Sequence, residues 1–145
     1  MITYKSTNAT AMSYGENNDC AVRATSVACN ISYKQAHAAM VAQGRKRGQG
    51  TTLGQIANAV TALGFQQTKL IGCPAKTVGQ LHKYLDADKK YFVEISGHIL
   101  AFAKGNVEDW TGERDKPSRH RVTRILEVTP LASKNSIRKA ARYAK

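Results

Sequence analysis

The amino-acid sequence predicts an α+β domain in which helices from the first half of the chain pack on an antiparallel sheet from the second half. Up to residue 64, apolar residues recur every three or four positions, which is the period of an amphipathic helix. From Lys90 onward apolar and polar residues alternate, which is the period of a strand. With 145 residues, 42% of them hydrophobic, the chain has room for one core, so we treat 1–145 as a single domain.

Capping signals divide the first part of the chain into separate helices. Three Ser or Thr residues are each followed, three positions later, by a glutamine, which is the spacing of a capping box. Asparagine or glycine stands where the first three helical patterns end, as is usual at helix C-termini. We therefore expect helices from Asp19 or Cys20 to Cys29, from Ser32 to Gly44, from Thr52 to Gly64 and from Thr77 to Leu85.

Short runs of β-branched and aromatic residues, separated by turn residues, predict the strands. Ser96-Gly97 and Gly105-Asn106 have the composition of tight turns, so the strands on either side of them form a meander. After Pro130 the pattern is that of a basic C-terminal helical tail over 131–145. We expect strands over 65–71, 91–95, 98–103, 107–110 and 121–128.

The composition argues against several classes of protein. No apolar run approaches the ~18 residues of a transmembrane helix, and the N-terminus lacks the basic-then-apolar pattern of a secretory signal. Three cysteines, Cys20, Cys29 and Cys73, without CxxC spacing argue against a disulfide framework or a zinc site. We expect a cytoplasmic protein without metal, cofactor or membrane association, located in the host cytoplasm or the virion if a phage encodes it.

The chain is strongly basic, and the positive charge is concentrated toward its C-terminal end. The formal net charge is +12, and from Gly112 to the end there are ten Lys or Arg residues against three acids. Such a basic region favours nucleic acid or an acidic partner, because binding to phosphates releases counterions. A solvated helix face that serves solubility explains the charge equally well.

Cys20 is the candidate nucleophile. It follows the polar, turn-prone run 14–19 and begins the first helix, where unpaired backbone N–H groups lower thiol pKa and favour the thiolate. The alternative is that Cys20 is a small core residue, as helical cysteines often are.

His98 is the candidate base, because it opens an apolar strand directly after a glycine and can face the helix that carries Cys20. Asp109 is the candidate acid across the hairpin. If Gly105-Asn106 is the turn, Phe102 lies opposite Asp109, and His98 is about 13 Å further along the ladder. A direct contact between His98 and Asp109 would then require a wider loop or a bulge.

These residues resemble a known family. Asn-Asp-Cys-Ala-Val-Arg-Ala at 18–24, Gly97-His98 before an apolar strand, and Val-Glu-Asp-Trp at 107–110 resemble the papain-like cysteine peptidases. The similarity is greatest to small bacterial and phage members related to bacteriocin-leader and NlpC-type peptidases. The resemblance implies a papain-like fold, with Cys20 as nucleophile, His98 as general acid and base, and Asp109 orienting the imidazole.

One position departs from the family pattern. Tyr14 stands where these families usually hold a glutamine that donates to the oxyanion, so Asn17 or Asn18 would take that role together with the Cys20 backbone N–H. The resemblance implies a cysteine peptidase, or a related acyl-transfer enzyme or amidohydrolase, acting on a protein or peptide. The alternative is a catalytically idle, basic protein on the same fold that binds nucleic acid or serves in virion assembly.

Overall fold

The computed structural model describes residues 3–6, 19–46, 48–109 and 120–131, so the expected C-terminal helix lies outside the described residues. The helices are α2 (Cys20–Ala28), α3 (Tyr33–Ala42), α4 (Leu53–Ala62), the short 3₁₀-helix η1 (Val78–Gln80) and α5 (Leu81–Tyr84). The strands are β1 (Thr3–Ser6), β2 (Phe65–Lys69), β3 (Lys90–Ile95), β4 (His98–Ala103), β5 (Asn106–Asp109) and β6 (Val122–Pro130). Within these described ranges, no helix has both the length and the apolar character needed to cross a membrane.

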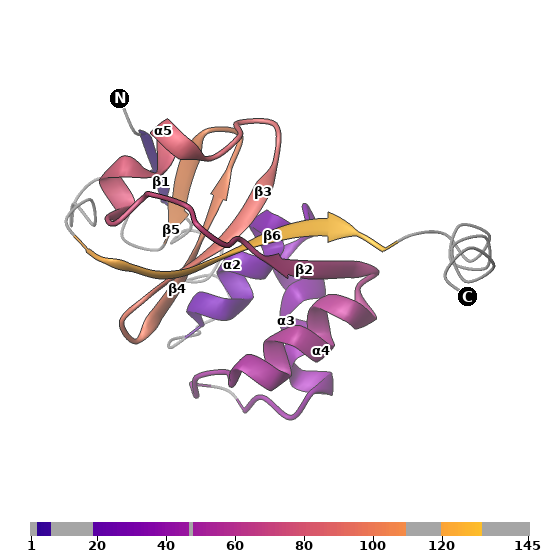
Figure 1. Cartoon of the computed structure of the whole chain (residues 1–145). Coiled ribbons are helices and arrows are strands. Elements are labelled where there is room, and N and C mark those ends of the chain that lie inside the picture. Colours follow the sequence, from indigo (N-terminus) through magenta and orange to yellow (C-terminus); the bar gives the residue numbers. More distant parts are fainter. Residues whose placement is uncertain (1–2, 7–18, 47, 110–119, 132–145) are drawn as a thin grey trace, which may run out of the picture.

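One sheet organises the molecule, and its strand order is β1-β5-β4-β3-β6-β2 (Figure 1). The expected meander is confirmed, because β3, β4 and β5 pair in sequence as antiparallel neighbours. The next strand, β6, does not extend the meander beside β5; it pairs with β3 on the opposite side and then with β2. At the other edge β1 pairs with β5 in parallel, so the sheet is mixed at that edge. The α+β class is confirmed.

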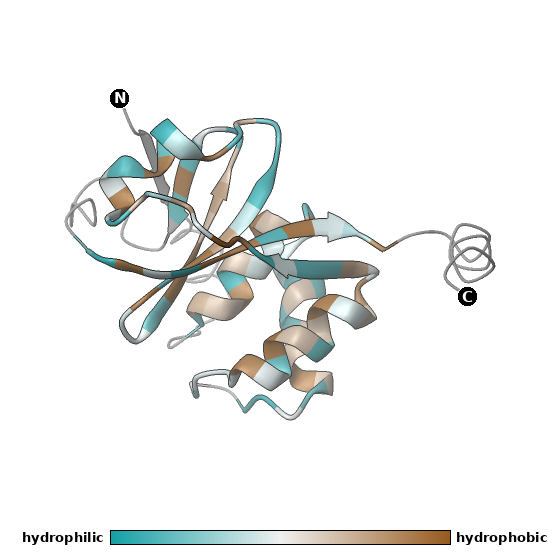
Figure 2. Cartoon of the chain, viewed as in Figure 1, coloured by the Kyte–Doolittle hydropathy of each residue, from teal (hydrophilic) through white to brown (hydrophobic). Residues whose placement is uncertain are grey.

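Each face of the sheet has its own apolar cluster. Phe92, Ile99 and Leu126 point to the face covered by α2, α3 and α4, while Leu100 and Phe102 point to the face covered by η1 and α5. Successive residues of β4 alternate between the two clusters, as the strand period requires. Figure 2 shows the resulting mixture of apolar and polar residues along strands and helices. The central strands β3 and β4 are therefore buried on both sides, and α2 packs against β4.

The ends of α3 and α4 confirm the expected capping boxes. The Ser32 hydroxyl accepts a hydrogen bond from the Gln35 backbone N–H at 3.1 Å, and Thr52 accepts one from Gln55 at 3.1 Å. In both boxes the glutamine side chain accepts in return from the backbone N–H of the cap residue. Helix α2 ends as expected before Asn30, which adopts a left-handed conformation with φ of 52°.

The third expected capping box, at Thr77, is wrong. The Thr77 side chain makes no cap hydrogen bond, and the segment forms a 3₁₀ turn before α5. Thr77 is instead bridged to Arg121, and the Val78 backbone N–H donates to the His120 carbonyl at 3.0 Å. The backbone at Thr77 and Val78 thus pairs with the segment before β6. The Gln80 side-chain oxygen accepts a hydrogen bond from the Lys76 backbone N–H and not from that of Thr77.

The turn between β4 and β5 also differs from the expectation. Ala103 pairs with Asn106, so the two turn residues are Lys104 and Gly105 rather than Gly105 and Asn106. Both turn residues have positive φ, 53° for Lys104 and 77° for Gly105, as the preferred two-residue hairpin turn requires. As a result Phe102 lies opposite Val107, and not opposite Asp109.

Candidate functional site

Cys20 is the first residue of α2, and the packing of this helix determines where its thiol lies. Ala21, Val22, Ala24 and Ala28 are at most 3% exposed and belong to the cluster between the helices and the sheet. These small side chains allow the helix backbone to approach β4 closely. Cys20 itself is only half-buried, so its sulfur lies at the margin of this interface.

His98 begins β4 directly after the tight turn at Ser96 and Gly97. Gly97 has φ of 67°, a left-handed conformation that glycine adopts readily, and it allows Ile95 and His98 to pair across the turn. The structure brings the His98 imidazole into a side-chain hydrogen bond with Cys20. The structure thus brings together the two residues that the sequence analysis expected to meet.

Two backbone groups also donate to the Cys20 sulfur. They are the N–H groups of Ala21, in the first turn of α2, and of Ile99, which follows His98 in β4. Sequence analysis missed Ile99 as a donor. The strand after His98 was expected, but the orientation of its first peptide toward the helix was not visible in the sequence pattern.

The surroundings of Cys20 favour its ionised form. Burial acts to raise the pKa of the Cys20 thiol, but the hydrogen bonds from His98 and Ile99 and the charge of His98 outweigh burial. The net result is a pKa of Cys20 below the ordinary thiol value of 9.0. A lowered thiol pKa next to an imidazole is the arrangement of an activated nucleophile.

Cys29 provides a contrast within the same helix region. It is 2% exposed, and burial raises the pKa of its thiol to about 11. Cys29 is thus a buried core residue. Cys73 is half-buried, and all three cysteines are free thiols.

Asp109 lies closer to His98 along the ladder than the sequence suggested. The pairs of β4 with β5 run as far as Ala101 opposite Glu108, and Asp109 also pairs with Ser6 of β1. Val107 rather than Asp109 lies opposite Phe102, and this shift of two residues from the expected register brings Asp109 nearer to the start of β4. The side chain of Asp109 lies outside the described part of the structure, as do Asn17 and Asn18.

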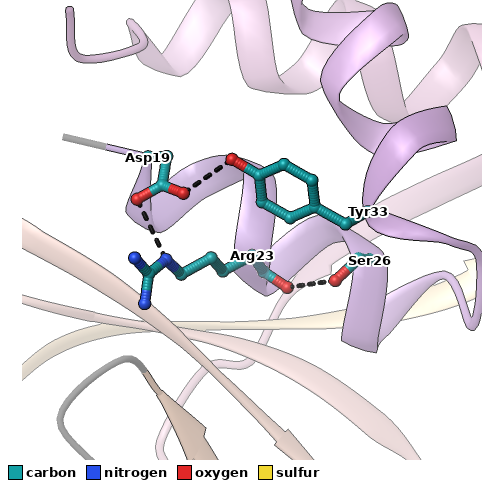
Figure 3. Close-up of polar contacts among 4 residues, drawn as sticks. All are labelled: Asp19, Arg23, Ser26 and Tyr33. Carbon is teal, nitrogen blue, oxygen red and sulfur yellow. Dashed lines mark hydrogen bonds and ion pairs between the residues drawn. The ribbon is translucent and has the colours of Figure 1, made fainter. Parts of the chain in front are cut away.

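A buried polar cluster precedes the nucleophile and was not foreseen. The Arg23 Nε donates to Asp19 Oδ1 at 2.9 Å, and the Tyr33 hydroxyl donates to Asp19 Oδ2 at 2.7 Å (Figure 3). Asp19 stands at the N-cap of α2, but its side chain makes no cap hydrogen bond. The spacing of Asp19 and Arg23 is a usable signal for such an ion pair, whereas Tyr33 comes from the next helix.

A cavity of about 310 Å³ lies between α4 and the sheet. Its apolar walls come mainly from Leu53 and Ile56 of α4 and from Ile99 and Leu126 of the sheet, and the Glu94–Arg124 ion pair adds a polar edge. Ile99 both lines this cavity and donates its backbone N–H to Cys20. Ile99 thus belongs both to the cavity wall and to the surroundings of Cys20, whereas Cys20 and His98 are not among the described lining residues.

Among the described residues, no group of three or more His, Cys, Asp or Glu side chains could hold a metal ion. No protein-family model, curated protein or solved structure matches the chain. We therefore infer the function of the chain from the geometry of its own residues.

Proposed function

We propose that this protein is a cysteine peptidase, or a related thiol-dependent acyl-transfer enzyme or amidohydrolase, with a papain-like arrangement of Cys20, His98 and Asp109. The observation that carries the proposal is the hydrogen bond between Cys20 and His98, together with the lowered pKa of the thiol. The contact of α2 with β4 supports it further, since a helix with the nucleophile against a strand with the base is what papain-like chemistry needs.

The chemistry would proceed in two steps. The Cys20 thiolate attacks the carbonyl carbon of an amide to form a tetrahedral oxyanion, which collapses to a thioester as the C–N bond breaks. The His98 imidazolium gives its proton to the departing amine. His98 then takes a proton from water as the water oxygen attacks the thioester carbonyl. The tetrahedral intermediate collapses with cleavage of the C–S bond, which releases the carboxylic acid and restores the Cys20 thiolate beside the His98 imidazolium.

Three further groups complete the proposed site. The Cys20 backbone N–H and the amide of Asn17 or Asn18 would donate to the oxyanion, and Asp109 would orient the imidazole. The cavity beside Ile99 would accept part of a protein or peptide substrate. Free thiols suit a reducing compartment, so we place the activity in a cytoplasm, that of the host if a phage encodes the chain.

The test uses a peptide library digested by the full chain, with cleavage products identified by mass spectrometry. The wild type is expected to release products, and Cys20→Ala and His98→Ala are each expected to abolish them. The matched control is Cys73→Ala, which removes a thiol with no assigned role and should retain cleavage. Products that persist in Cys20→Ala would contradict the proposal.

The net charge of +12 favours a second candidate, a catalytically idle protein that binds nucleic acid or an acidic partner through its basic C-terminal region. This candidate predicts binding to a DNA or RNA duplex that weakens steeply with salt and is unchanged in Cys20→Ala. Binding that is absent at low salt would exclude it.

A further inference from the structure

The cluster of Asp19, Arg23 and Tyr33 lies directly beside the candidate nucleophile, and the proposed chemistry does not use it. These three residues are 3%, 8% and 5% exposed. A buried carboxylate is costly unless it is both paired and hydrogen-bonded, and replacing such a cluster with apolar residues is often neutral or stabilising. Stability is thus a weak explanation for placing this cluster next to Cys20.

The hydrogen bonds of Asp19 connect the start of α2 to α3. Its two carboxylate oxygens accept from Arg23 Nε and from the Tyr33 hydroxyl, as Figure 3 shows. Its backbone carbonyl accepts from the Arg23 N–H at 3.0 Å, which is the first hydrogen bond of the helix. With φ of −108° and ψ of 24°, Asp19 departs from the extended conformation of the caps of α3 and α4. The Asp19 carboxylate therefore binds Tyr33 of α3 and does not cap α2.

We propose that Asp19, Arg23 and Tyr33 are positioning residues that hold the first turn of α2 so that the Cys20 sulfur keeps its hydrogen bond to His98. The inference rests on the proposed function, because the orientation of Cys20 matters only if its thiol reacts.

Other titratable groups face this part of α2. On α3, the His37 ring lies 5.9 Å from the Tyr33 ring between centroids. On β5, Glu108 lies opposite Ala101 and so shares the sheet face that packs on α2. On β3, Lys90 is close enough to Cys29 to influence its pKa. Because these groups also titrate, the test compares variants that leave all of them unchanged.

The test measures the rate at which iodoacetamide alkylates Cys20, resolved by peptide mass spectrometry, at pH 6.5 and pH 9.5. Tyr33→Phe removes only the hydroxyl that donates to Asp19. The matched control is Tyr91→Phe, because Tyr91 is similarly buried, at 3% exposed against 5% for Tyr33. Its hydroxyl accepts from the Asp86 N–H at 3.2 Å, on the other side of the sheet. Thermal unfolding of both variants shows whether each remains folded.

If the cluster positions Cys20, Tyr33→Phe lowers the alkylation rate at pH 6.5 by about threefold or more and leaves the rate at pH 9.5 near that of the wild type. The reason is that a misplaced thiol loses its pairing with His98 but still ionises at high pH. Tyr91→Phe is expected to match the wild type at both values. A purely structural role would lower the unfolding temperature of Tyr33→Phe without changing this pH dependence.

Two results would overturn the inference, and they are distinguishable. If wild-type Cys20 reacts quickly at pH 6.5 and Tyr33→Phe retains that rate, the positioning role is wrong while the proposed function stands. If wild-type Cys20 reacts no faster than Cys73, the proposed function fails, and the positioning role falls with it.

Discussion

Cys20 and Cys29 show how the surroundings of a single residue decide its chemistry. They lie at the two ends of α2, yet the pKa of Cys20 is lowered whereas burial raises that of Cys29 to about 11. The difference is that His98 and two backbone N–H donors stabilise the Cys20 thiolate, while only the charge of Lys90 opposes the effect of burial on Cys29. Its position at the start of the helix singles out Cys20 in the sequence, whereas its contact with His98 depends on the fold.

This contrast gives a prediction for the thiols. Alkylation proceeds through the thiolate, so its rate rises as the pH passes the pKa of each group. Cys20 is expected to react at lower pH than an ordinary thiol, whereas Cys29 stays slow until the pH approaches about 11. Peptide mass spectrometry after brief iodoacetamide treatment between pH 6 and pH 9.5 measures both. Alkylation of Cys29 in step with Cys20 would contradict the assigned environments.

The register of Asp109 gives a second prediction at this scale. Asp109→Asn is expected to lower peptide cleavage about tenfold or more, because a neutral amide orients and stabilises the imidazolium of His98 less well. Asp88→Asn makes the same chemical change at an exposed position before β3 and should leave cleavage unchanged. Equal activity of both variants would remove Asp109 from the site.

At the scale of the element, the helix ends show which local signals were reliable. The boxes at Ser32 and Thr52 formed as predicted because the chain before each helix is free to supply the cap. The same spacing at Thr77 did not form a box, because the bridge to Arg121 takes the backbone there. Likewise, the β4–β5 turn uses Lys104, a residue type that rarely adopts positive φ, so sequence analysis placed the turn one residue late.

The two threonines provide a matched test. Thr52→Ala removes a cap hydrogen bond and is expected to lower the free energy of unfolding by about 1 kcal/mol. Thr77→Ala removes no cap bond and is expected to cost less than about 0.5 kcal/mol. Urea denaturation of both variants measures the difference. A larger loss at Thr77 would show that its side chain has a role beyond the contacts described here.

At the scale of the whole molecule, sequence analysis predicted the kinds of element and the meander but not the strand order. The pairing of β6 with β3 joins residues about 30 positions apart, and the parallel pairing of β1 with β5 joins the start of the chain to its second half. Local periodicity contains no information on such contacts. The meeting of Cys20 with His98 could be predicted because the two residues open elements that must pack together, whereas the Asp19–Tyr33 contact depends on the angle between two helices.

The central claim is that the fold places the Cys20 thiol against the His98 imidazole and thereby activates it. The most direct measurement is the alkylation rate of Cys20 as a function of pH in the wild type and in His98→Ala. We expect the wild-type profile to lie below that of an ordinary thiol with a pKa of 9.0, and the His98→Ala profile to move upward toward that value. Superimposable profiles for the two proteins would contradict it.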